Sequence, residues 1–148
     1  MTEDIQITIK DLLNSQKLAV LATLTEDQPY ENLVAFVATE DLQHLIFATA
    51  QYTRKFANIK ANPKVSLLID NRSNVEVDFH MGVAVTALGE AEEISIPERQ
   101  NILNFYLKKH PYLENFVTAP SCSFFRVRVC KYILVSDFQK VVEWILTE

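Results

Sequence analysis

Glycine is scarce in this chain of 148 residues, and only Gly82 and Gly89 occur. A P-loop and a Rossmann dinucleotide fingerprint each need several glycines in a fixed spacing, so neither is present. A glycine-rich cradle for phosphate is therefore excluded. Any phosphate that this protein binds has to be held by side chains and by the N-terminus of a helix.

Side chains arranged for catalysis or metal binding without a cofactor are also few. The two cysteines, Cys122 and Cys130, are too few for a disulfide framework or a zinc site, and we expect ordinary buried or partly buried thiols. The three histidines, His44, His80 and His110, lie in different predicted elements and outside metal-ligand spacing. No catalytic triad, HExxH motif or carboxylate pair stands out, so an enzyme of this sequence has to rely on a cofactor.

Charge and hydropathy exclude two further classes of protein. The net charge of −5 argues against a nucleic-acid binder, because phosphate backbones need a basic surface. No apolar run approaches the ~20 residues that span a bilayer, and the N-terminus lacks the basic region of a signal peptide. With 49% hydrophobic and 22% charged residues, we expect one soluble cytoplasmic domain over residues 1–148.

Hydrophobic periodicity predicts a mainly β fold: a small antiparallel barrel with peripheral helices. The tail from residue 138 to 145 fits a final strand or a short helix. The predicted helices cover residues 3–14, 52–61 and 97–110, and the predicted strands cover residues 18–24, 30–38, 44–49, 64–70 and 123–135, with two or more strand pieces within 75–94.

The last long strand is predicted to have one apolar and one mixed face, and Gly89 suits a bend or bulge in the strand before it. The apolar face would carry Phe125, Val127, Val129, Ile133 and Val135, and the other face Arg126, Arg128, Cys130 and Tyr132.

Residues 45–70 hold the strongest candidate site. They read as a strand, a short helix, the stop Asn62-Pro63 and a second strand. Arg54 and Lys55 fall in the first turn of this helix, where the dipole disfavours a cation unless an anion is also present. Thr49 and Thr53 add hydroxyl groups. We call this junction of strand and helix, with Thr49, Thr53, Arg54 and Lys55, the corner. Its residues predict a binding site for the phosphate of a small cofactor.

Three segments, FATAQYTRK at 47–55, NPKVSLL at 62–68 and LGEAEEI at 88–94, resemble the pyridoxamine 5′-phosphate oxidase-like family of FMN-binding split barrels. The resemblance covers about residues 18–94 and fits the last third more loosely. It implies a split barrel of six to seven antiparallel strands and a homodimer with FMN in the groove between the subunits.

The resemblance also implies roles for particular residues. Arg54 and Lys55 would hold the FMN phosphate, supported by Thr49 and Thr53, while Ala48 offers backbone or packing contact only. A stretch of the second strand would run along the flavin ring, and the end of the fourth strand adds two weaker candidates. These further residues are Asn32, Leu33, Val34, Ala35, Asp70 and Asn71.

The sequence departs from the oxidase at two places. Ala84 stands where the oxidase carries a flavin-contacting glutamine, and its C-terminal Trp/Arg pattern is absent. We therefore expect an FMN-dependent oxidoreductase with another, unidentified small-molecule substrate. A flavin- or haem-binding module without turnover is the alternative, and a deazaflavin reductase ranks lower because no further basic cluster is present. Trp144 either covers the flavin of the partner subunit or packs in the interface.

Overall fold

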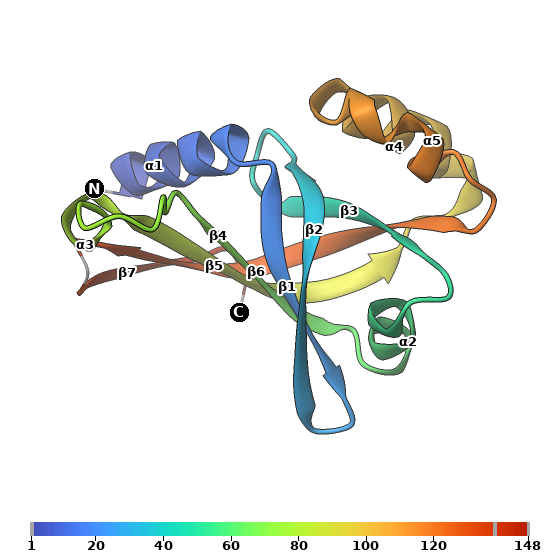
Figure 1. The fold of residues 1–148 in the computed structure, drawn as a ribbon, viewed down its shortest axis with the longest axis horizontal. Helices are drawn as coiled ribbons and strands as arrows, with labels where there is room; N and C mark the ends of the chain where they lie inside the picture. The colour runs from blue at the N-terminus through green and yellow to red at the C-terminus, as the bar shows by residue number, and fades with distance from the viewer. Residues whose placement is uncertain (1, 138, 148) are drawn as a thin grey trace.

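A ring of six antiparallel strands forms the centre of the molecule (Figure 1). The computed structural model describes residues 2–137 and 139–147. The strand order is β3-β2-β1-β4-β5-β6-β7, and pairing of β3 with β6 closes the ring and leaves β7 outside it. The strands are β1 Leu18–Thr25, β2 Gln28–Ala38, β3 His44–Ala50, β4 Lys64–Asp70, β5 Val83–Glu93, β6 Cys122–Ser136 and β7 Lys140–Ile145. The predicted mainly β barrel is confirmed, and the tail forms a strand.

Helices cover the barrel at several places. The helices are α1 Thr2–Ser15, α2 Arg54–Ala61, α3 Asp78–Met81, α4 Ile96–Lys109 and α5 Glu114–Val117, and a 3-10 turn, η1, spans Pro111–Leu113. Ile9 and Leu13 of α1 and Ile59 of α2 belong to the same core as the inward side chains of the strands. The helical spacing of these apolar residues explains why α1 and α2 pack on the barrel.

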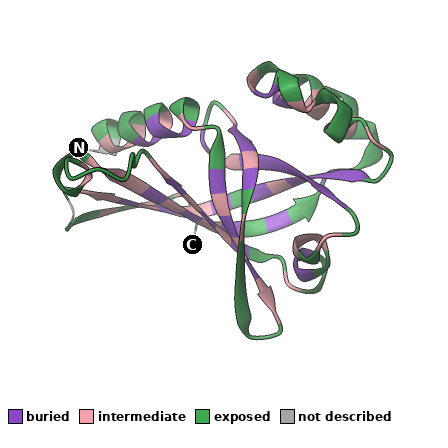
Figure 2. Ribbon diagram, in the orientation of Figure 1, coloured by how far each residue is buried: buried purple, intermediate pink, exposed green. Residues whose placement is uncertain are grey.

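The strands alternate between buried and partly exposed residues (Figure 2). Leu21 of β1 and Leu67 and Ile69 of β4 are completely buried inside the barrel. Their neighbours Val20 and Leu68 face outward and are paired across β1 and β4. This period of two follows from the pleat of the strand and gives each strand one core face.

A second, smaller core lies where α4 and α5 cover the outer face of β3 and β6. Tyr106 of α4, 1% exposed, packs edge-on against Phe124 of β6, with the ring centroids 5.3 Å apart. The Tyr106 hydroxyl donates a hydrogen bond of 3.0 Å to the carbonyl of Ala35 in β2. This contact ties α4 to the same strand that borders the candidate site.

The face pattern predicted for β6 is wrong beyond residue 129, because the strand contains a bulge. Leu88 pairs with Lys131 while Gly89 pairs with Val129, so Cys130 is an extra residue. An extra residue moves all later side chains to the opposite face. Tyr132 is therefore buried, whereas Ile133 and Val135 are only half-buried on the outer face.

The bulge also explains Gly89, and here the prediction is confirmed. A Cβ at this position would collide with the carbonyl oxygen of Arg128 on the neighbouring strand. The close approach of the two backbones needs a residue without a side chain.

The prediction of two or more strand pieces within residues 75–94 is also wrong. Only β5 is a strand, and residues 71–82 form a loop with the short helix α3. The Asp78 carboxylate accepts hydrogen bonds of 2.8 and 2.7 Å from the N–H groups of Ser73 and Asn74, and Asn74 has a φ of 61°. This local hydrogen bonding competes with strand pairing.

Candidate functional site

The barrel is split along the edge between β2 and β3. These strands pair only from Phe36↔Phe47 to Ala38↔Leu45. Before residue 36, β2 runs on alone along this edge, and β3 continues past Phe47 paired with β6 instead, as Figure 1 shows. Both strand edges that border the split therefore lack a strand partner over these residues within the described chain.

The end of β3 turns sharply into α2 at this split. Thr53 is the N-cap residue, and its hydroxyl accepts a hydrogen bond from the N–H of Phe56 at 3.3 Å. The Thr49 and Thr53 hydroxyls lie 2.8 Å apart, and each also lies within hydrogen-bond distance of the carbonyl oxygen of Ala50. Thr49 is completely buried. The two threonines thus come together as expected, with their hydroxyls engaged in shaping the turn.

Arg54 and Lys55 follow directly in the first turn of α2. Neither side chain makes an ion pair within residues 2–137 and 139–147, and the backbone N–H groups of the two residues have no acceptor there. The Arg54 guanidinium lies over the ring of Tyr30, 5.7 Å from its centroid. Burial lowers the pKa of the Lys55 ammonium. The corner thus offers two cations and two N–H donors without an anion.

The β2 residues named by the resemblance lie along the split but face different sides. Val34 points into the barrel and is 5% exposed, whereas Leu33 points outward and is 62% exposed. Asn32 pairs with the buried Leu21 and shares its inner face. The Oδ1 atom of Asn32 is buried and has no hydrogen-bond partner in the described structure. The Ala35 carbonyl is taken by Tyr106.

Ala48, Asp70 and Asn71 lie apart from the cations of the corner. Ala48 is buried in the small core beneath α4. Asp70 forms an ion pair of 3.0 Å with Arg72, and the Asn71 side chain accepts a hydrogen bond of 2.8 Å from the Val83 N–H. They stand at the far end of the seven-residue β4, roughly 20 Å from its start beside α2. Within one chain, Asp70 and Asn71 therefore do not join the corner.

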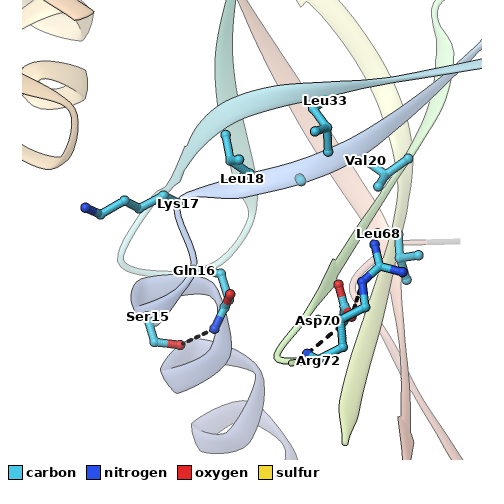
Figure 3. A pocket seen from close by; sticks show the side chains of 10 residues that line it. Ser15, Gln16, Lys17, Leu18, Val20, Leu33, Leu68, Asp70 and Arg72 are labelled. Carbon is cyan, nitrogen blue, oxygen red and sulfur yellow. Dashed lines mark hydrogen bonds and ion pairs between the residues drawn. The ribbon is translucent and has the colours of Figure 1, made fainter. Parts of the chain in front are cut away.

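The outer face of β1, β2 and β4 carries an apolar row. Leu33, Val20 and Leu68 stand opposite one another on the three strands, and Leu18 beside them is 54% exposed. Figure 3 shows these side chains, which line a pocket of about 460 Å³ together with Asp70. This pocket shares Leu33 with the β2 stretch but none of the cations of the corner.

A hydrogen-bonded chain behind the corner has no clear signal in the sequence. Gln51 donates to the Ser123 hydroxyl at 2.9 Å, and Ser123 donates to the Glu93 carboxylate at 2.8 Å. Glu93 also forms an ion pair of 3.0 Å with Lys60 of α2. These residues are far apart in sequence and meet only because β3 pairs with β6. These hydrogen bonds fix the turn, and Glu93 neutralises Lys60. Arg54 and Lys55 are left as the unpaired cations of α2.

The remaining polar residues support no other centre. His110 is buried, and its Nε2 atom lies 2.7 Å from the Phe36 carbonyl. Both cysteines are free, with Cys122 buried and Cys130 partly buried. Residues 2–137 and 139–147 contain no cluster of three or more groups suited to a metal ion. Over the same residues, no helix has the length and apolar character required to span a membrane.

Comparison with known proteins identifies the family. The sequence profile of the pyridoxamine 5′-phosphate oxidase family matches residues 5–134. The chain therefore belongs to the pyridoxamine 5′-phosphate oxidase-like split-barrel family. A pyridoxamine 5′-phosphate oxidase homolog of Schizosaccharomyces pombe is 34% identical in a match that covers 47% of this chain and 43% of that protein. The match thus spans less than half of the curated relative.

Solved structures show the same fold at low sequence identity. A heme binding protein from Mycobacterium smegmatis has a TM-score of 0.80 at 18% identity, over 90% of this chain and 55% of that one. A FAD-binding protein from Mesorhizobium loti has a TM-score of 0.67 at 21% identity, over 87% of this chain and 90% of that one. The fold of this family thus occurs in proteins that bind flavin and in proteins that bind haem.

Proposed function

We propose that this protein binds FMN and that Arg54, Lys55 and the free N–H groups at the start of α2 hold the phosphate of FMN. The observation that carries the proposal is Lys55, a half-buried ammonium at the positive end of a helix with no anion beside it in the described structure. Both burial and the helix dipole disfavour this charge. A bound phosphate offsets both effects, and the arginine beside it adds a fork of donors.

The edge of β2 is the proposed place for the rest of the flavin. The Ala35 carbonyl points away from β1 toward Tyr106. The backbone N–H and C=O groups of successive residues in a strand point to opposite edges, so residues two apart point to the same edge. The N–H and C=O groups of Leu33 therefore point away from β1, as the Ala35 carbonyl does, and face the split. Leu33 thus borders the cofactor through its backbone groups, with Asn32, Val34 and Ala35 beside it. Thr49 and Thr53 shape the turn that presents Arg54 and Lys55.

Isoalloxazine chemistry would supply hydride or single-electron transfer when FMN is bound. The turn after β3 and α2 contain no histidine and no carboxylate, and the nearby Glu93 is held by Ser123 and Lys60. The protein's own part is to bind and orient the cofactor and to keep water away from it. We propose an oxidoreductase whose small substrate is still to be identified, in the cytoplasm, where both free thiols stay reduced.

The proposed working form is a homodimer with the flavin at the subunit interface. The outer row of Leu33, Val20 and Leu68, with Leu18 beside it, is an apolar face with Leu18 and Leu33 exposed and Val20 and Leu68 half-buried, and a second copy would cover it. Asp70 and Asn71 lie at the edge of this face and are distant from their own corner. They reach a flavin only if they come from the partner subunit.

Flavin binding tests the phosphate site. The purified protein titrated with FMN should quench flavin fluorescence, and the Arg54→Ala/Lys55→Ala variant should bind FMN at least about 100-fold more weakly, as expected for two lost charge-assisted contacts. Lys108→Ala/Lys140→Ala is the charge-matched control, because both lysines are exposed and form no ion pair within residues 2–137 and 139–147. Equal FMN affinity in all three proteins would refute the proposed phosphate site.

The absorption spectrum separates the remaining alternatives. A Soret band after haem addition, with no response to FMN, would favour a haem-binding module. The described histidines give that alternative little support, because none lies at the corner and His110 is already hydrogen-bonded. A protein that binds FMN but is not reduced by NADH or NADPH without oxygen would instead be a carrier or sensor.

The dimer has its own test. Leu33→Glu places a charge in the middle of the apolar row and should convert a dimer into a monomer in light scattering. Leu33 is 62% exposed in the single chain, so the variant should still fold. A dimer of unchanged stability in this variant would contradict the proposed interface.

A further inference from the structure

Two strands lie end to end along one edge of β6. β3 pairs with residues 122–128 of β6, and β7 pairs with residues 131–136, while β5 takes the opposite edge (Figure 1). The start of β3 and the end of β7 therefore meet beside Val129 and Cys130. A cavity of about 460 Å³ lies at this meeting point, and we call it the junction cavity. Its volume is within the range of small-molecule sites, roughly 300–1,000 Å³.

Hydrogen bonds fix both rims of the junction cavity. On one rim, the carbonyl of Gln43, in the turn before β3, accepts a hydrogen bond of 2.9 Å from the Val129 N–H. On the other rim, the N–H of Leu146, just after β7, donates to the Cys130 carbonyl at 2.8 Å. The cavity is thus held open by the backbone of three distant segments, and a ligand would find it preformed.

A guanidinium with spare donors lines this cavity. Arg128 of β6 stands opposite His44 of β3, and both residues belong to the lining. Arg128 forms an ion pair of 3.2 Å with Glu90 through its Nη2 atom, and both side chains are half or more exposed. Exposed ion pairs of this kind contribute little to stability. The guanidinium can therefore bind a carboxylate of a ligand at little cost.

A carboxylate lines the same cavity. The Oδ1 atom of Asp41 accepts hydrogen bonds of 3.0 Å from the Gln43 N–H and 2.7 Å from the Thr39 hydroxyl. These hydrogen bonds lower the pKa of the Asp41 carboxyl, so that it stays charged at neutral pH. A ligand can bind through the second oxygen, Oδ2, because the two hydrogen bonds go to Oδ1.

The apolar part of the lining comes from the end of β7. The Trp144 ring stacks on the ring of the buried Tyr132, with the centroids 5.6 Å apart, and so has a fixed orientation. Trp144 and Ile145 both line the cavity, with Val129 of β6 beside them. An indole offers a surface to an apolar side chain and also attracts an ammonium group.

We propose that the junction cavity is a second ligand site and that it binds a small zwitterion with an apolar side chain, which is the chemistry of an amino acid. Arg128 binds the carboxylate, Asp41 the ammonium and Trp144 the side chain. An anion alone would be repelled by Asp41, and a cation alone by Arg128. The site is independent of the proposed FMN site, because β3 has seven residues and sets the corner at its other end, roughly 20 Å away.

Three ligands of one shape test the charges. L-Phenylalanine carries both charges, phenylalaninamide only the ammonium, and 3-phenylpropionate only the carboxylate. Trp144 is the only tryptophan of the chain, so its fluorescence reports a ligand in the cavity, and calorimetry measures the same affinities. L-Phenylalanine should bind at least about tenfold more tightly than either analogue, since each analogue lacks one charge-assisted contact.

Two variants assign the contacts. Asp41→Asn keeps the acceptor oxygen of the turn and should bind L-phenylalanine about tenfold more weakly, with no loss for 3-phenylpropionate. Arg128→Gln should weaken L-phenylalanine binding to a similar extent, with no loss for phenylalaninamide. The controls are Glu76→Gln and Lys108→Gln, which change exposed charges outside the cavity and should leave all affinities unchanged. Arg128→Met is the second variant if glutamine impairs folding.

The outcomes decide the proposal without reference to flavin. Absence of binding for all three ligands would overturn the site. Equal binding of all three would mean that only apolar contacts act, and tighter binding of 3-phenylpropionate would mean an anion site; both results overturn the zwitterion. Unchanged affinity for L-phenylalanine in Asp41→Asn and Arg128→Gln would place the ligand elsewhere on the molecule. The proposed FMN site would remain intact in each case.

Discussion

Two half-buried lysines, Lys55 of α2 and Lys109 of α4, stand in opposite electrostatic situations. The Lys109 ammonium donates a 2.9 Å hydrogen bond to the Leu13 carbonyl in the last turn of α1 and lies 4.0 Å from the centroid of the Phe36 ring. Lys55 has no such partners in the described chain and lies at the wrong end of its helix for a cation. Burial lowers the pKa of both ammonium groups.

The difference separates a structural cation from one that awaits a ligand. Lys109 is completed by groups of its own chain, since a carbonyl and an aromatic face both stabilise an ammonium. At Lys55 the chain supplies only further positive charge, from Arg54 and two free N–H groups. Partial burial alone is therefore uninformative, and the presence or absence of partners distinguishes the two regions. The following predictions test that distinction.

The largest effect on stability is expected where the polar groups are fully partnered. Asn58→Leu removes both hydrogen bonds to Thr23 and Thr25 and leaves the Thr23 hydroxyl, 2% exposed, without its donor. We expect the free energy of unfolding in urea to fall by about 3 kcal/mol. Asn32→Leu at the same end of the barrel should instead leave the free energy of unfolding unchanged or raise it, because it removes a buried oxygen that has no hydrogen-bond partner. A loss of similar size in both variants would show that the distinction between the two amides is wrong.

Lys55→Met should weaken FMN binding by about 2 kcal/mol, or roughly 30-fold, because it removes one charge-assisted contact to the phosphate. The free energy of unfolding of the ligand-free protein should stay the same or rise, since the charge is unfavourable there. Fluorescence titration and urea unfolding measure the two quantities on one sample. Riboflavin, which has no phosphate, is the control ligand, and its affinity should not change.

Lys109→Met should show the reverse behaviour. The variant keeps the apolar stem but loses the hydrogen bond to Leu13 and the contact with the Phe36 ring. We expect the free energy of unfolding to fall by about 1–2 kcal/mol with unchanged FMN affinity. Weaker FMN binding in this variant, at constant stability, would mean that the two regions are not independent.

The sequence predicted the parts of this comparison that are local. The position of Arg54 and Lys55 in the first helical turn and the stop at Pro63 are encoded within a dozen neighbouring residues. The helix itself begins at Arg54 and not at residue 52 as predicted, because Thr53 caps it. The barrel strands follow from apolar periodicity, and the family resemblance supplied their closure.

What escaped prediction depends on contacts between distant segments. The bulge at Cys130 is set by the backbone of β5, so the pattern within β6 alone placed Tyr132 on the wrong face. The Gln51–Ser123–Glu93 chain needs the pairing of β3 with β6. The unpartnered amide of Asn32 shows only when all possible partners are in place. Single-sequence periodicity contains none of these relations.

The smallest effect concerns pH and again separates the two lysines. Burial lowers the pKa of Lys109 in the folded protein to about 8, from 10.5. Between these values the unfolded chain holds more protons than the folded one, so this group adds stability as the pH rises and loses it as the pH falls through 8. The carbonyl, the ring and the partial exposure limit the gain to about 1 kcal/mol. The difference in unfolding free energy between the unaltered protein and Lys109→Met should grow from pH 8 to 10.

The pKa of Lys55 is also lowered, but its effect should be seen in the pH dependence of FMN affinity and not in that of stability. Phosphate favours the charged ammonium, so FMN affinity should fall at alkaline pH, as Lys55 loses its proton below the usual lysine range. In Lys55→Met this alkaline decline should be weaker, while riboflavin affinity should not follow it in either protein. The contribution of Lys109 to the unfolding free energy should rise with pH, and the contribution of Lys55 to FMN affinity should fall. Both results together would show that Lys109 acts on the stability of the fold and Lys55 on the binding of the ligand. Identical alkaline declines of FMN affinity in the unaltered protein and in Lys55→Met would remove Lys55 from the phosphate site.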